Sequence, residues 1–144
     1  TKVAEMPYDF VRRRLTVVVA DPAAPGRHRL VSKGAVAQVL DACDRARVDG
    51  VEAALDDALR ARLDAWCAAR GADALRVLAV AAAARDARDD WTRDDETRLV
   101  LEGFLLFRDP PRPDAADAIA SLARLGVRTT MVTGDSRWVA AHLA

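Results

Sequence analysis

Apolar and polar residues in the first third of the chain are arranged as they are in paired β-strands. Leu15 to Ala20 is a run rich in β-branched residues, which is typical of a strand buried on both faces. Residues 21 to 26 contain two prolines and a glycine and favour a turn. His28 to Ser32 then predicts a second strand. Because a short turn joins these segments, we expect an antiparallel pair.

Two stretches with helical spacing follow. Ala35 to Ala46 predicts a helix that is broken at residues 47 to 50, with four apolar residues on one face: Val36, Val39, Leu40 and Cys43. The next stretch, which ends at Gly71, predicts an amphipathic helix, because leucines recur at every fourth position: Leu55, Leu59 and Leu63.

Leu75 to Ala84 is continuously apolar, so its periodicity fits either a strand or a helix. We expect a strand through at least Val80, because its valines favour one and a helix has just ended. The densely charged segment from Arg85 to Asp95 predicts a surface loop. Leu99 to Phe107 predicts another strand, bent at Gly103.

A proline-rich stretch, residues 109 to 113, separates this first part from the rest of the chain. Beyond it, Asp114 to Leu125 predicts a helix stopped by Gly126, with four residues inward: Ala116, Ile119, Ala120 and Ala123. Val127 to Val132 predicts a strand, and the Thr133-Gly134-Asp135 motif follows it. In doubly wound α/β sheets, ligands bind at this end of a strand.

These patterns predict two parts. Residues 1–109 form an α+β domain, an antiparallel sheet flanked by helices, and residues 110–144 begin a Rossmann-like α/β segment that is cut short. The chain opens on Thr1 and stops within a predicted helix, so we expect an excised segment of a longer protein.

Composition narrows the class of protein. With 144 residues, 51% of them hydrophobic, and 22 basic against 22 acidic residues, the chain is long enough for one buried core and is no nucleic-acid binder by overall charge. No apolar run approaches the length of a membrane span, so we expect a soluble chain. Cys43, Cys67, His28 and His142 have no metal-ligand spacing, and we expect no metal site.

Lys33 is the strongest local candidate for binding chemistry. It lies where the second predicted strand gives way to a helix, and Gly34 beside it tolerates backbone conformations closed to other residues. An ammonium next to the N–H groups of a helix start favours a phosphate or another anion. The alternative interpretation is a solvated lysine at the end of a strand.

Four short stretches of the sequence together carry a resemblance to a known family. They are MPYDFVRRRL (residues 6–15), VSKGA (31–35), ALRVLAVA (74–81), and FRDPPR followed by MVTGD (107–112 and 131–135). In that order and spacing they resemble the cytoplasmic headpiece of P-type cation-transporting ATPases. The opening resembles the bacterial magnesium-transporting branch. The resemblance covers nearly the whole chain and implies a nucleotide-binding domain followed by the start of a haloacid-dehalogenase-like phosphorylation domain.

The resemblance implies an ATP site. Tyr8 stands where the family has a stacking phenylalanine, and a phenol ring still offers a face to adenine. Lys33 would line the adenine pocket and Gly34 would let the backbone approach the base. Arg76 and Arg13 would lie near the phosphates. Without the resemblance, Tyr8 would be interpreted as an aromatic residue at the start of a strand. Arg12, Arg13 and Arg14 would be interpreted as a solvated strand end.

The resemblance also implies a hinge between the two domains, formed by Asp109, Pro110, Pro111 and Arg112. Thr133, Gly134 and Asp135 would belong to the phosphate site of the parent enzyme, with a hydroxyl and backbone N–H donors for the phosphoryl group. From the sequence alone, this motif is equally a strand-to-helix turn with Asp135 as its N-cap.

The nucleophilic aspartate of the family's DKTGT motif and the magnesium-binding GDGxND motif do not occur in these residues. We therefore expect the segment to bind ATP weakly and not to hydrolyse it, because aspartyl phosphate chemistry needs both groups. Implied cofactors are ATP and, with ATP in the parent, Mg²⁺. Implied partners are the remaining phosphorylation, actuator and transmembrane domains, at the cytoplasmic face of the cell membrane.

Two other functions stay open. A non-catalytic regulatory or interaction module of this fold would have lost nucleotide binding. A small haloacid-dehalogenase-type phosphatase is disfavoured, because no DxD-type nucleophile is present. Magnesium is implied only by the resemblance of Met6 to Val19, and calcium or proton transport stays open as an alternative. We expect residues 114–144 to pack on the first domain or to pair with another copy.

Overall fold

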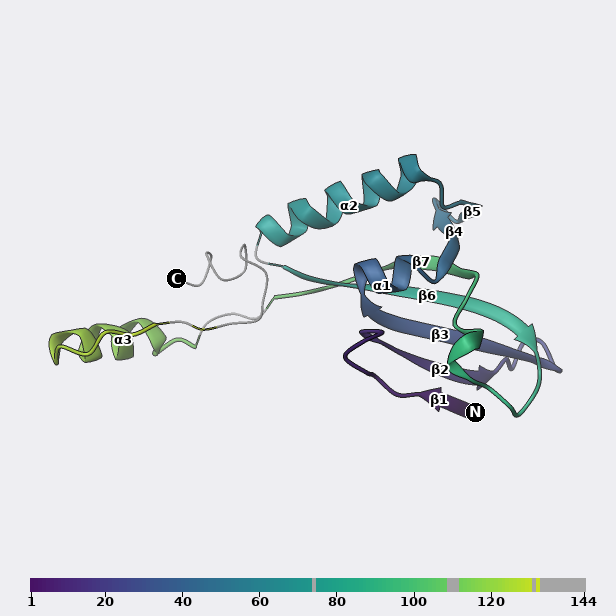
Figure 1. The fold of residues 1–144 in the computed structure, drawn as a ribbon, viewed down its shortest axis with the longest axis horizontal. Helices are drawn as coiled ribbons and strands as arrows, with labels where there is room; N and C mark the ends of the chain where they lie inside the picture. The colour runs from purple at the N-terminus through teal and green to yellow at the C-terminus, as the bar shows by residue number, and fades with distance from the viewer. Residues whose placement is uncertain (74, 109–111, 131, 133–144) are drawn as a thin grey trace.

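The computed structural model describes residues 1–73, 75–108, 112–130 and 132. Their strands form one mixed, seven-stranded sheet in the order β1-β2-β3-β6-β7-β4-β5 (Figure 1). The strands are β1 (Lys2–Met6), β2 (Arg14–Ala20), β3 (Arg27–Ala35), β4 (Cys43–Val48), β5 (Val51–Ala54), β6 (Arg76–Asp86) and β7 (Leu99–Phe107).

The expected antiparallel arrangement holds for most of the sheet but is wrong for one pair. β2 pairs with β3, β3 with β6, and β6 with β7, all antiparallel. β4 instead runs parallel to β7. A parallel pair needs a long crossover connection, and here α2 and β6 lie between the two strands in sequence.

The prediction of one long helix from Ala35 to Ala46 is also wrong. The helix α1 spans only Val36–Leu40, and the chain then enters β4. β4 gains hydrogen-bonded neighbours on both sides, β5 and β7, so pairing within the sheet satisfies its backbone. The buried Cys43 and Ala46 had the spacing of a helix face, but they face the core from a strand.

Helix α2 (Asp57–Ala72) confirms the amphipathic helix predicted before Gly71. Asp56 caps it, since its carboxylate accepts a hydrogen bond of 2.8 Å from the backbone N–H of Leu59. Leu59 and Leu63 pack against the main core cluster. The ring of Trp66 stacks on Phe104 of β7, with centroids 5.1 Å apart, so α2 covers one face of the sheet.

Small residues make up the sheet side of this core. Ala79, Ala81 and Ala83 of β6 lie beneath α1 and α2, together with Leu99 and Leu101 of β7. β6 therefore confirms the predicted strand, and it extends through Asp86, into the segment predicted as a loop. The β6–β7 register shifts beside Gly103, the position of the predicted bend.

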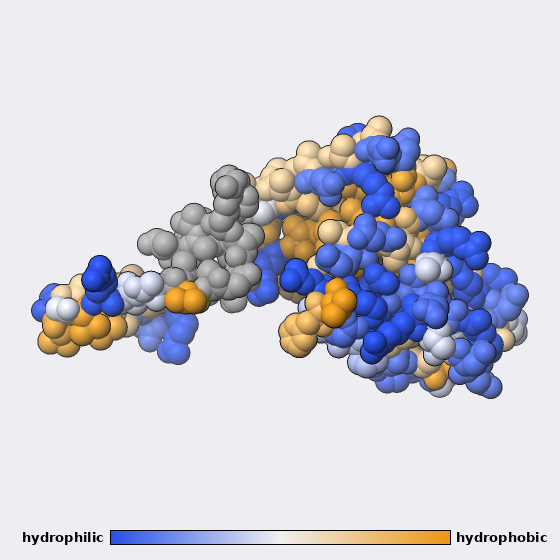
Figure 2. All heavy atoms as spheres, in the orientation of Figure 1, coloured by the Kyte–Doolittle hydropathy of each residue, from blue (hydrophilic) through white to orange (hydrophobic). Residues whose placement is uncertain are grey.

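The C-terminal part departs from the prediction. Helix α3 (Ala115–Arg124) forms as expected, but it lies away from the sheet (Figure 1) and shows apolar residues on its surface (Figure 2). The residues predicted to face inward are exposed: Ala116, Ile119, Ala120 and Ala123. The described residues 127–130 and 132 form no strand, so the strand predicted from Val127 to Val132 is wrong over these residues.

Several predicted residues lie outside the described part of the chain: Asp109, Pro110 and Pro111 of the hinge and Thr133, Gly134 and Asp135 of the phosphate motif. The remaining hinge residue, Arg112, is exposed and donates to Asp114, with Nε 3.1 Å from Oδ1. No helix among the described residues has the length and hydropathy needed to span a bilayer.

The buried Cys43 thiol is expected to resist alkylation in the native protein. Burial is the main cause that raises the pKa of Cys43 to about 12, with Arg60 opposing and Asp44 adding to it. Since the thiolate is the nucleophile, labelling at pH 8 should modify Cys67 first and Cys43 only after unfolding. Mass spectrometry with iodoacetamide, with and without urea, measures this. Equal labelling of both cysteines in the native protein would contradict it.

Candidate functional site

An open groove of about 610 Å³ lies where the β1–β2 loop meets the ends of β3 and β6. It is lined by Tyr8, Phe10, Arg13, Leu15, Lys33, Gly34, Ala35, Arg76 and Leu78. Every residue that the resemblance implied for nucleotide binding is in this lining, although the residues come from three separate stretches of sequence. The groove therefore brings the candidate site together.

The groove opens on the face of the sheet away from α2. Lys33 and Leu78 line it, whereas their sequence neighbours Ser32 and Ala79 are buried. Because successive residues of a strand project to opposite faces, the side chain of Lys33 points away from the main core. Lys33 is a residue of β3, which continues to Ala35, so the expected position at a strand-to-helix corner is wrong by two residues.

Two aromatic rings form one wall of the groove. Tyr8 is 52% exposed and Phe10 is 87% exposed, and their ring centroids are 5.7 Å apart in an edge-to-face arrangement. Exposed aromatic rings at the rim of a groove offer faces to a planar ligand. Sequence reasoning missed Phe10, although its signal was present: a second aromatic residue two positions after Tyr8.

Gly34 is required at its position because another part of the backbone comes close to it, and not because of the unusual backbone conformation expected from the sequence. Its φ is not in the left-handed region, since it is a regular residue of β3 opposite Arg14 and Ala79. A Cβ built on it would lie 2.3 Å from the carbonyl oxygen of Arg13 and 2.6 Å from Arg14 Cα. The missing side chain therefore makes room for the backbone of Arg13 and Arg14.

The lining of the groove is positively charged. Arg13, Lys33 and Arg76 contribute to it, and no carboxylate of the described residues does. Groups of this kind attract a polyanion such as a phosphate chain, and guanidinium groups bind phosphate oxygens in pairs. The chemistry of the groove thus fits a ligand with a planar ring at one end and phosphates at the other.

The three consecutive arginines are divided between the two faces of the sheet. Only Arg13 lines the groove, while Arg12 and Arg14 both donate hydrogen bonds to Oε2 of Glu96. For Arg14 the distance from Nε is 3.0 Å. Glu96 neutralises part of the positive charge expected near Tyr8. Sequence reasoning missed Glu96. The sequence indicated only that three adjacent arginines need an acidic partner, and not which residue it is.

The carboxylate of Glu96 is fully buried and remains ionised. Burial alone would raise its pKa, but hydrogen bonds from Arg12 and Arg14 outweigh this effect and hold the pKa below the usual range. Its Oε1 has no hydrogen-bond partner among the described residues. The carboxylate is thus held by its contacts with the two arginines.

Asp9 organises the loop that carries the two rings. Its Oδ1 accepts from the backbone N–H groups of Val11 at 3.0 Å and Arg12 at 2.7 Å. The hydrogen bond from the Arg12 backbone is the largest cause that lowers the pKa of Asp9. Arg13 closes the loop with a positive φ of 47°, and its carbonyl accepts from the N–H of Ala35 at 2.9 Å.

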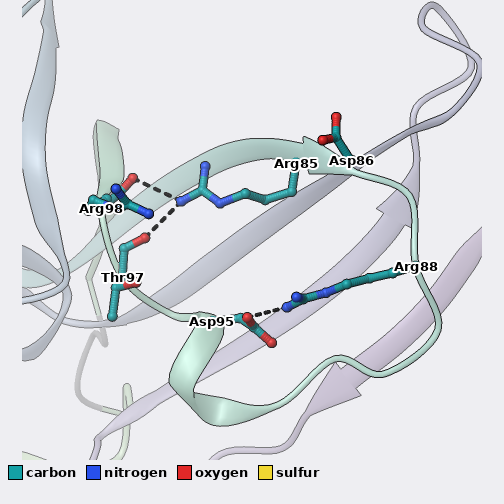
Figure 3. Close-up of a pocket in the computed structure, with 6 residues that line it drawn as sticks. All are labelled: Arg85, Asp86, Arg88, Asp95, Thr97 and Arg98. Carbon is teal, nitrogen blue, oxygen red and sulfur yellow. Dashed lines mark hydrogen bonds and ion pairs between the residues drawn. The ribbon is translucent and has the colours of Figure 1, made fainter.

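A second hollow, of about 290 Å³, lies at the β6–β7 connection (Figure 3). Arg85 donates to the carbonyl oxygens of Thr97 and Arg98, and Arg88 forms an ion pair with Asp95 (Figure 3). These contacts join parts of the β6–β7 connection to each other. We therefore assign the side chains around the hollow a structural role. Among the described residues, no group of three His, Cys, Asp or Glu side chains is placed to hold a metal ion.

Comparison with known proteins shows the family of the chain. The family model described as P-type ATPase, cytoplasmic domain N, matches residues 1–114. Magnesium-transporting ATPase, P-type 1, of Escherichia coli K12 is 40% identical over 143 residues, as is its counterpart in Salmonella typhimurium LT2. Calcium-transporting ATPase 1 of Lactococcus lactis is 30% identical over 144 residues. The chain belongs to the P-type ATPase family.

Each of these alignments covers 99% of this chain but only 16% of the relative. The chain thus corresponds to one region of proteins that are several times longer. The resemblance to this family seen in the sequence motifs is confirmed.

Proposed function

We propose that the groove binds ATP, as part of a P-type ATPase that transports magnesium. The observation that carries the proposal is that Tyr8, Lys33 and Arg76 line a single groove, although they are far apart in sequence. A purine with a phosphate chain matches the rings at one side and the cations that complete the lining.

Each lining residue has a part in this proposal. The adenine stacks on the ring of Tyr8, and the Lys33 ammonium lies across from it. Gly34 leaves the β3 backbone close to the base. Arg76 contacts phosphate oxygens through its guanidinium, and Arg13 adds positive charge beside them. Because stacking and a few charged contacts supply the affinity, we expect a dissociation constant on the order of 0.1 to several millimolar.

The transported ion is assigned from the relatives. The relatives named magnesium-transporting are 37 to 40% identical to this chain, against 30% for those named calcium-transporting. In the parent enzyme Mg²⁺ also accompanies ATP, where it screens the phosphate charge. The chain itself contains neither a DKTGT nor a GDGxND motif, so we expect it to bind ATP without turnover.

The proposal places residues 1–109 in the nucleotide-binding domain and residues 110–144 in the hinge and the start of a haloacid-dehalogenase-like phosphorylation domain. Thr133, Gly134 and Asp135 would serve the phosphate site there. The exposed apolar residues of α3, Ile119 and Leu122, would contact the rest of that domain or a second copy of the chain. The parent would hold this segment at the cytoplasmic face of the membrane.

An NMR titration with ATP tests the proposed function. Amide resonances of Tyr8, Gly34 and Arg76 should shift, and Tyr8→Ala should weaken binding by about 1 kcal/mol or more, because base stacking is lost. Lys33→Met should also weaken it. The matched control is Lys2→Met, since Lys2 lies on β1 outside the groove and pairs with Glu5.

The rival function predicts a different result. A regulatory or interaction module of the same fold would show no shift of these resonances at about 10 mM ATP, roughly the weak edge of the expected range. Equal ATP affinities for the Lys33 and Lys2 variants would also favour the rival, because loss of a lysine that contacts bound ATP should change the affinity. A parallel assay of phosphate release should give no turnover.

A further inference from the structure

Glu96 lies on the opposite face of the sheet from the groove. It accepts from Arg14 of β2, which lies opposite the buried Gly34, whereas the adjacent Leu15 lies opposite Lys33 and lines the groove. The side chain of Glu96 is 0% exposed. A buried carboxylate is costly unless it is paired, so its position needs a physical reason beyond surface charge.

The two residues next to Glu96 in the chain, Asp95 and Thr97, are both held by arginine side chains (Figure 3). On the preceding side, Asp95 pairs with Arg88 and accepts from the N–H of Thr92 at 2.8 Å. On the following side, the carbonyl oxygen of Thr97 accepts from Arg85 at 2.9 Å. The segment is therefore a rigid support for the carboxylate that it carries.

The carboxylate reaches the aromatic loop through Arg12. Glu96 accepts from Nη1 of Arg12, whose Nη2 donates to the carbonyl oxygen of Pro7 at 2.9 Å and whose Nε donates to Asp9 at 2.5 Å. Pro7 precedes Tyr8 directly. A continuous set of hydrogen bonds thus connects Glu96 on one face with the start of the ring-bearing loop on the other.

Arg14 provides the second connection. It donates through Nε to Glu96 and through Nη1 to the carbonyl oxygen of Gln38 in α1 at 2.8 Å. With Arg12 and Arg14 both held on the helix-bearing face, Arg13 between them is left to line the groove. One buried carboxylate therefore constrains both flanks of Arg13.

We propose that Glu96 is a positioning residue of the groove: its carboxylate holds Arg12 and Arg14 so that Tyr8, Phe10 and Arg13 face Lys33 in the ligand-free protein. The proposal rests on the function proposed above for the ligand, but the ordering of the loop is independent of it. A preformed groove binds more tightly, because no binding energy is spent on ordering the loop.

The test is Glu96→Gln, which keeps the volume of the side chain and removes its charge. If the loop of the variant is ordered about a tenth of the time, its ATP affinity falls about tenfold. Amide hydrogen exchange without nucleotide should accelerate at residues 8–13 and stay unchanged in β6 and β7. The control is Glu102→Gln, which removes an exposed carboxylate that pairs with Arg47 at 2.7 Å, outside the groove.

Arg12 tests the same contact from the more exposed side. Arg12→Gln should reproduce both effects, and Arg12→Lys should recover part of the affinity, because it keeps the positive charge next to Glu96. A general loss of structure would lower protection throughout the sheet and would not be relieved selectively by lysine.

The outcomes separate the two proposals. Unchanged loop exchange in Glu96→Gln would overturn the positioning role, whether or not ATP binds. Loss of protection throughout the sheet in Glu96→Gln would also overturn it, since the carboxylate would then support the fold as a whole. Faster exchange confined to residues 8–13 with no ATP binding in the wild type would uphold the positioning role and refute the nucleotide assignment.

Discussion

Replacing Gly34 with alanine is expected to lower the free energy of unfolding by about 1 to 3 kcal/mol and to remove ATP binding. The added Cβ would lie 2.3 Å from the carbonyl oxygen of Arg13 and 2.6 Å from Arg14 Cα. Both are backbone atoms, which cannot swing aside as the end of a flexible side chain does. The β2 and β3 strands must separate here, and the separation displaces the loop that carries Tyr8.

Urea denaturation of the Gly34 variant measures the loss of stability, and the NMR titration measures the loss of binding. Gly71→Ala is the matched control, because a Cβ there meets no atom within 4 Å and the residue lies in α2. The free energy of unfolding of the control variant should rise by about 0.5 to 1 kcal/mol, the difference between glycine and alanine in a helix. If both variants were equally stable, the close approach at Gly34 would be wrong.

Leu99→Ala is expected to lower the free energy of unfolding by about 2 to 5 kcal/mol, the range for truncating a large buried aliphatic side chain to alanine. Leu99 is 0% exposed and belongs to the main core cluster with Val39 and Leu40 of α1. Its backbone N–H also donates to the carbonyl oxygen of Ala42 at 2.9 Å, where β4 begins to pair with β7. The cavity would therefore lie where α1, β4 and β7 meet.

Urea denaturation with a constant m-value would show that Leu99→Ala changes stability and not the extent of unfolding. The control is Leu125→Ala, since Leu125 is 79% exposed just after α3 and its loss should stay within about 0.5 kcal/mol. A Leu99 variant as stable as this control would place Leu99 outside the core.

Local pattern was sufficient where one side-chain period dominates a segment. The β-branched run of β2, the leucine spacing of α2 and the apolar run of β7 predicted these elements close to their observed bounds. β4 was missed because its buried residues also fit a helical period. Its conformation is decided by β5 and β7, with which it forms hydrogen bonds.

The candidate site divides in the same way. The resemblance to the family suggested Tyr8, Lys33 and Arg76, and Lys33 was also singled out by its place at the end of a predicted strand. Phe10 and Glu96 were not suggested. Glu96 is 84 positions from Arg12, with which it forms a hydrogen bond, and no local pattern reports a contact over that separation.

The sequence by itself determined the family, four of the strands (β2, β3, β6 and β7), the second helix and the residue types that line the groove, because these depend on side-chain chemistry and on spacing along the chain. Tertiary structure decided the parallel β4–β7 pair, the division of three adjacent arginines between two faces, and the burial of Glu96. These features depend on which distant segments lie side by side, since hydrogen bonds and ion pairs act over a few ångströms of space whatever the separation in sequence.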